Sequence, residues 1–114
     1  MKPFQQVIDR IIKLADENPD RIADCKYFDQ GEPCCIVGHV LAELGAVQDF
    51  DESVRVGDYT FPNSEAADSI CWDVFDVEEP DPIEETFLVT VQELQDEGCR
   101  WGSAVDDALE SSGI

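Results

Sequence analysis

The sequence predicts a mostly α-helical fold, an irregular bundle of four to five helices to which a small β-hairpin could be added. Apolar residues recur at helical spacings of three and four along much of the chain. Helix start and stop signals stand at the ends of these segments. A chain of 114 residues, 43% of them hydrophobic, is also long enough to bury a core of its own. We therefore expect a single helical domain over residues 1–114.

The first predicted helix follows Pro3 and ends before Pro19. Proline suits the first helical turn because its missing N–H would have no partner there. It also pushes the residue before it, here Asn18, out of the helical region. Between these limits the apolar side chains fall on one helical face, which consists of Phe4, Val7, Ile8, Ile11, Ile12 and Ala15.

A second helix is predicted from Pro33 or Cys34 to Leu44. Gly45 follows it at the position where a left-handed residue often ends a helix. Gly38 interrupts this helix at a cost of about 1 kcal/mol relative to alanine. We therefore expect another stretch of backbone to pack closely against the helix at Gly38.

The regions on either side of this helix carry weaker strand signals. Residues 25–33 contain a short extended segment and a turn, a weak signal that would also allow a small hairpin here. Residues 54–61 place two short β-prone runs around Gly57-Asp58, an order that a type II′ turn accepts. We expect residues 46–62 to be a mixed loop with room for one hairpin.

Further helices are predicted in the second half of the chain. A third helix, capped by Asn63 or Ser64, would bury the apolar residues among positions 66–75. The motif at residues 81–84, Asp-Pro-Ile-Glu, fits the first positions of a fourth helix, which Gly98 would end. Ser103 would cap a last short helix, with a tryptophan just before it.

The charge of the chain is its most unusual property. There are 27 acidic and 7 basic residues, which give a formal net charge of −20. Nucleic acids and anionic membranes bind Lys and Arg, so this balance argues against direct binding to either. The expected partners are water, metal cations or a protein with a basic surface.

The carboxylates gather in two runs, of which Asp49, Asp51 and Glu52 form the smaller. Neither run fits the calcium loop of an EF-hand. The larger run is a candidate surface for a basic partner, and its carboxylates could imitate the phosphates of DNA. A solvated face, or adaptation to a high-salt cytoplasm, would explain the same composition. The candidate interaction residues are Asp73, Asp76, Glu78, Glu79, Asp81, Glu84 and Glu85.

The N-terminal stretch does not look like a targeting signal, because Asp9, Arg10 and Lys13 interrupt its apolar residues. The chain also lacks the apolar run of about 18 residues that a transmembrane helix needs. We therefore expect a cytoplasmic protein whose five cysteines are reduced thiols.

Cys25, Cys34, Cys35 and His39 are candidate metal ligands. Cys35 and His39 are four residues apart, on one helical face, and zinc prefers thiolate and imidazole ligands. The same pair could form a catalytic dyad with a thiolate favoured by the helix dipole. The simpler interpretation is that the cysteines pack as small hydrophobic residues, while His39 faces solvent or pairs with Glu43. No enzyme motif is present, and no cofactor other than zinc is indicated.

Two segments resemble parts of a known family. Cys35 to Leu41 reads CIVGHVL, similar to a CIVGHAL segment, and Gln95 to Val105 reads QDEGCRWGSAV. Together they resemble a family of small uncharacterised proteins of actinobacteria and their phages. This resemblance implies a phage accessory protein inside an actinobacterial cell, and it implies no catalytic residues.

Two hypotheses for function remain. The first is an accessory protein that binds and modulates a host protein through an acidic surface, with DNA mimicry as a special case. The second is a metal- or thiol-dependent domain that uses Cys34, Cys35 and His39.

Overall fold

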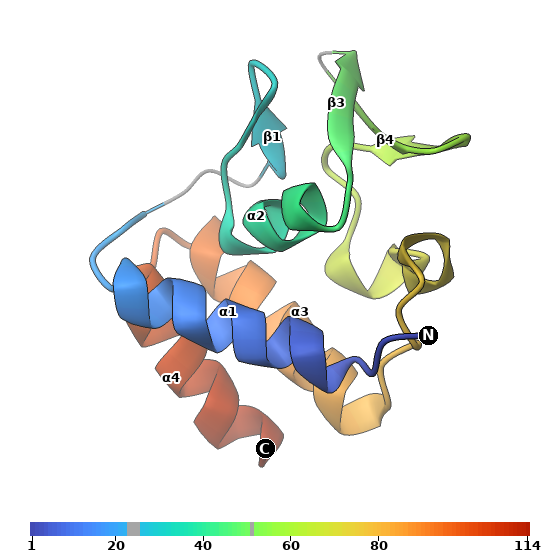
Figure 1. Cartoon of the computed structure of the whole chain (residues 1–114). Coiled ribbons are helices and arrows are strands. Elements are labelled where there is room, and N and C mark those ends of the chain that lie inside the picture. Colours follow the sequence, from blue (N-terminus) through green and yellow to red (C-terminus); the bar gives the residue numbers. More distant parts are fainter. Residues whose placement is uncertain (23–25, 51) are drawn as a thin grey trace.

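Four helices and two small antiparallel sheets make up the described part of the chain, residues 1–22, 26–50 and 52–114 of a computed structural model (Figure 1). The helices are α1 (Gln5–Glu17), α2 (Ile36–Glu43), α3 (Pro82–Asp96) and α4 (Trp101–Ser112). Two 3-10 turns precede α3, namely η1 (Ala67–Ser69) and η2 (Trp72–Phe75). The strands are β1 (Phe28–Asp29), β2 (Glu32–Pro33), β3 (Val47–Phe50), β4 (Ser53–Val56) and β5 (Tyr59–Pro62).

The prediction of a mostly α-helical bundle is therefore wrong, because the described chain has an irregular α+β fold. Figure 1 shows α1, α3 and α4 grouped together, with the strands on the far side of α2. β1 and β2 form a two-stranded sheet, and β3, β4 and β5 form a three-stranded sheet in that order. Hairpins are present at both places where the sequence allowed one, at residues 25–33 as β1 and β2 and at residues 54–61 as β4 and β5. The strand β3 was expected to be loop.

The prediction of a helix between Asn63 and Phe75 is also wrong. Its place is taken by η1 and η2, and the backbone between them is extended at Ile70 and Cys71. A helix would place Ile70 and Trp72 about 200° apart around its axis. The extended break allows both side chains to be buried, each less than 5% exposed. Burial of both side chains outweighs the helical hydrogen bonds that are lost.

The ends of α3 agree with the sequence. Glu84 N–H donates to the Asp81 side chain at 2.8 Å, and Asp81 N–H donates to the Glu84 carboxylate at 3.0 Å. This reciprocal pair is a capping box, with Pro82 at the first helical position. Gly98 follows the helix with a φ of 89°. α4 begins earlier than expected, at Trp101 instead of after Ser103.

The core is one continuous cluster to which all four helices contribute. The Phe4 ring stands edge-on to Trp72, with 5.0 Å between the ring centroids, and so joins the start of α1 to η2. Gly38 of α2 lies against the backbone of Tyr27, and a Cβ at Gly38 would overlap the Tyr27 carbonyl oxygen. The expectation that another backbone packs closely at Gly38 is confirmed.

Asn63 supplies a polar link across the core. Its side chain accepts a hydrogen bond from Phe28 N–H at 2.9 Å and donates to Phe28 C=O at 2.7 Å. The residue is 3% exposed, and both contacts are buried. Asn63 therefore ties the end of β5 to β1, where the sequence predicted a helix cap.

Candidate protein interaction surface

The predicted acidic residues lie on one continuous segment that runs from η2 into the first turn of α3. Five of the seven are exposed, and Glu84 and Glu85 are half-buried. Two have structural roles, because Asp81 and Glu84 form the capping box of α3. The exposed carboxylates without such a role are those of Asp73, Asp76, Glu78 and Glu79.

Acidic residues continue beyond this segment, along the rest of α3 and along α4. From residue 56 to residue 114 the chain carries 16 carboxylates and a single cation, Arg100. We call residues 56–114 the acidic segment. No carboxylate in it is buried, and α3 and α4 are joined by a short connection and pack against each other. The added candidates on these two helices are Glu93, Asp96, Asp106, Asp107 and Glu110.

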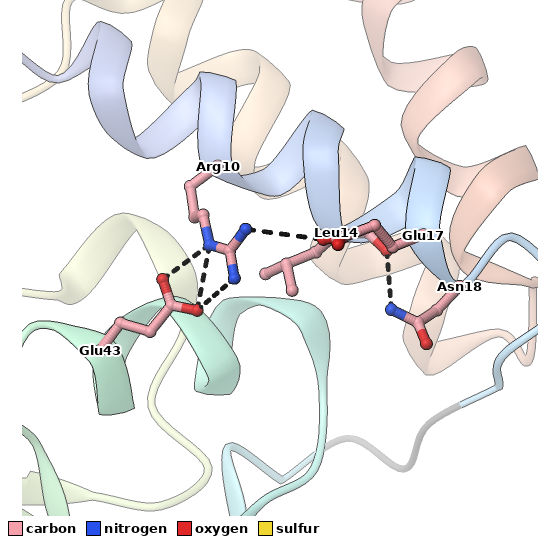
Figure 2. A network of polar contacts seen from close by, with 5 residues as sticks. All are labelled: Arg10, Leu14, Glu17, Asn18 and Glu43. Atoms are coloured by element: carbon pink, nitrogen blue, oxygen red, sulfur yellow. Dashed lines mark hydrogen bonds and ion pairs between the residues drawn. The ribbon is translucent and has the colours of Figure 1, made fainter.

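The first half of the chain differs in how its charges are balanced. Six of the seven cations precede residue 56. Arg10 of α1 holds Glu43 of α2 through two guanidinium nitrogens, with N–O distances between 2.6 and 3.0 Å, and Glu17 lies 3.6 Å from a third nitrogen (Figure 2). Arg55 pairs with Asp49 at 3.4 Å.

Within the acidic segment no described carboxylate has a side-chain cation within ion-pair distance. Asp76 lies 4.0 Å from the amino group of Met1, the one positive group so placed. Burial and the negative charge of Glu93 both raise the pKa of Asp96 above its usual value. The negative charges of this segment therefore repel one another, and a partner's cations would relieve that repulsion.

The cysteine and histidine cluster has a different character. Cys35 is the N-cap residue of α2, and its Sγ accepts a hydrogen bond from Gly38 N–H at 3.3 Å. Burial raises the pKa of the Cys35 thiol to about 12. This shift disfavours the thiolate that a catalytic dyad of Cys35 and His39 would need, because the effect of burial is larger than that of the helix dipole. Cys25 lies outside the described residues.

His39 packs into the corner where α2 meets the start of α4. Its ring stands edge-on to Trp101 at 5.3 Å, and the Arg21 guanidinium lies 4.7 Å from the centroid of the same tryptophan. Glu43, the expected partner of His39, pairs with Arg10 instead. The buried His39 Nε2 has no hydrogen-bond partner among the described residues. Burial and the nearby Arg21 charge lower the pKa of His39.

This environment predicts a pH dependence that belongs to His39. Because its pKa is lower in the folded state, the unfolded chain takes up a proton first as the pH falls through 6.5. The wild type therefore keeps its full stability with respect to this residue above pH 6.5, and its free energy of unfolding decreases as the pH falls below that value. We expect His39→Phe, which keeps a ring against Trp101, to become progressively more stable than the wild type between pH 7 and pH 5. Urea titrations of both proteins across this range measure the difference, and parallel stability curves would contradict it.

The described residues hold no group of three or more His, Cys, Asp or Glu side chains arranged to bind a metal ion. Cys34 is half-buried and Cys35 fully buried, so the two adjacent residues differ in their access to solvent. We expect a chelator to leave the melting temperature of the purified protein unchanged. A drop of several degrees, restored by zinc, would instead support the metal hypothesis and implicate Cys25.

Among the described residues, no helix is both long and apolar enough to cross a lipid bilayer. Comparisons of the chain with protein-family models, with curated proteins and with solved structures find no significant match.

Proposed function

We propose that this protein is a small binding protein that acts by covering a basic surface of a partner protein, without chemistry of its own. The observation that supports this most strongly is the charge distribution of the acidic segment. It contains 16 carboxylate side chains and one cationic side chain, and none of the carboxylates is buried. Carboxylates that have no side-chain cation of the described residues within ion-pair distance remain free to pair with the cations of a partner.

The physical consequence is a fast and salt-sensitive association. Charge complementarity steers two proteins together and raises the association rate, and added salt screens this attraction. Nucleic acids and anionic membranes carry the same sign of charge as the segment and are disfavoured as partners. The resemblance to small actinobacterial and phage proteins suggests a host protein in the cytoplasm as the partner, with this chain as a phage accessory protein.

A DNA-binding protein is the special case of such a partner. B-DNA presents one negative charge about every 1.7 Å along its axis, and a carboxylate surface that satisfies the same cations would compete with it. The exposed positions of α3 and α4 are the rigid part of the acidic segment on which such an arrangement would be built. Competition between this protein and a fluorescent DNA duplex for the partner tests mimicry. If an excess of the protein leaves the duplex bound, mimicry is wrong, even when binding itself is confirmed.

The experiment that tests the proposal is capture from an actinobacterial lysate with the tagged protein, at low and at high salt, followed by mass spectrometry. We expect one dominant partner with a basic surface, present at low salt and lost at high salt. A partner that stays bound at high salt would contradict an electrostatic interface. Recovery of no enriched protein under either condition would contradict partner binding.

A further inference from the structure

A groove of about 280 Å³ lies between α1, α2 and the residues that precede α1. We call these residues, Lys2 and Pro3, the N-terminal strap. No residue of α3 or α4 lines the groove. Its walls are largely apolar and include Val7 of α1, Val40 and Leu44 of α2, and Val77. The strap is fixed by its backbone to the neighbouring residues 76–78: Lys2 N–H donates to Asp76 C=O at 2.9 Å, and Glu78 N–H donates to Lys2 C=O at 2.8 Å. The two hydrogen bonds hold the strap in place, and the strap forms one wall of the groove.

The rim of the groove carries a local charge opposite to that of the protein. Lys2 and Arg10, two of the seven cations, line it together with a single carboxylate, Glu43. Arg10 is already held by Glu43 and Glu17, as Figure 2 shows. Lys2 is exposed, and no described carboxylate lies within ion-pair distance of its ammonium group. The groove therefore offers apolar walls and one unpaired cation on a chain of net charge −20.

We infer that this groove binds a free medium-chain carboxylate. The alkyl chain would contact the side chains of Val7, Val40 and Leu44, and the carboxylate would accept hydrogen bonds from the ammonium group of Lys2. Ligand pockets in proteins are commonly apolar clefts in which a few polar groups fix the orientation of the ligand. This site borders the acidic segment at one place: Val77 lines the groove, and the backbones of Asp76 and Glu78 hold Lys2. None of the other groove residues belongs to the acidic segment.

Three probes with the same alkyl chain test the inference: octanoate, octanol and octylammonium. The overall charge of the protein attracts octylammonium and repels octanoate, so only a local cation can reverse this order. We expect octanoate to cause saturable NMR shift changes centred on Val7, Val40, Leu44 and Val77, with weaker binding of octanol and none of octylammonium. Equal or tighter binding of octanol or octylammonium at the groove, or no saturable change with octanoate, would overturn the inference.

A matched pair of variants separates Lys2 from the general charge of the protein. Lys2→Gln should weaken octanoate binding about two- to fivefold, the effect of one exposed ion pair, and leave octanol binding unchanged. Lys13→Gln removes the same charge from an exposed position of α1 that does not line the groove, and it should have no effect. Gln6→Trp, at an exposed position on the rim, should block the binding of both octanoate and octanol. Equal losses for the two lysine variants would overturn the role of Lys2.

Discussion

Replacing Gly38 with alanine is expected to lower the free energy of unfolding by about 3 kcal/mol or more, because the new methyl group would clash with neighbouring backbone atoms. Its Cβ would overlap the Tyr27 carbonyl oxygen and lie 2.8 Å from the carbonyl carbon. Tyr27 cannot move away easily. Its carbonyl accepts a hydrogen bond from Cys34 N–H at 2.8 Å, and its side chain is fully buried.

Urea unfolding of the wild type and Gly38→Ala measures this effect. Gly102→Ala is the comparison variant, since Gly102 is also in a helix. A Cβ there would lie 3.0 Å from the Pro19 Cβ and 3.1 Å from the Pro19 carbonyl oxygen, which are tight contacts without the overlap found at Gly38. Gly102→Ala should cost clearly less than Gly38→Ala, because its closest contacts are near 3 Å instead of overlapping, and alanine also favours the helix. Similar losses in the two variants would contradict the close approach at Gly38.

Replacing Asn63 with alanine is expected to cost about 2–5 kcal/mol. The substitution removes a donor and an acceptor at once, and it leaves the N–H and C=O of Phe28 unpaired in a buried place. Each unsatisfied buried group costs about 1–3 kcal/mol. The attachment of β1 to β5 should weaken, because both side-chain bonds to Phe28 are lost. It should not be abolished, because the backbone C=O of residue 63 still accepts a hydrogen bond from Tyr27 N–H at 3.3 Å.

Thermal unfolding and hydrogen exchange test the role of Asn63 together. Asn63→Ala should lower the melting temperature and speed the exchange of the Phe28 amide beyond the change in global stability. Ser64→Ala, at the exposed neighbouring position, should stay within about 0.5 kcal/mol of the wild type. A loss below 1 kcal/mol for Asn63→Ala would show that water replaces the two bonds.

The parts of the fold that were predictable are those with local causes. The start of α3 follows from the Asp81, Pro82 and Glu84 pattern, since a capping box involves only its own residues. The close approach at Gly38 followed from the presence of a glycine inside an apolar helix. The sequence did not reveal that the approaching backbone belongs to Tyr27, which lies outside the helix and is separated from it by a turn.

The parts that were missed depend on distant contacts. Ile70 and Trp72 suit a helix in their composition, but the core they enter is completed by Phe4 at the other end of the chain. The strand β3 contains polar Gln48 and Asp49, and it forms because β4 offers a partner, with an irregular register between Gln48 and Phe50. Pairing of this kind is decided by the neighbouring strand more than by intrinsic propensity.

The candidate interaction surface was identified only in part. The run from Asp73 to Glu85 was visible as a local density of carboxylates. The contribution of α4 and of α3 beyond its first turn was not visible, because the acidic residues there stand singly or in pairs along the helices instead of in a dense run. The signal that would have revealed them is the absence of Lys and Arg between Arg55 and Arg100.

The central claim, that the acidic segment meets a basic partner, is tested most directly by two variants that each remove four negative charges. One carries Glu93→Gln, Asp106→Asn, Asp107→Asn and Glu110→Gln on α3 and α4, and the control carries Asp16→Asn, Asp20→Asn, Asp29→Asn and Glu32→Gln. All eight positions are exposed, and none is part of an ion pair given by the described residues.

The measurement is the affinity of each variant for the captured partner at about 50 mM and about 300 mM salt. We expect the α3 and α4 variant to bind about tenfold or more weakly at low salt, because four interfacial charges are lost, and its affinity to depend less on salt. The control should bind like the wild type. Equal weakening of the two variants would show that net charge alone governs binding, and unchanged binding of the α3 and α4 variant would show that the partner contacts another surface.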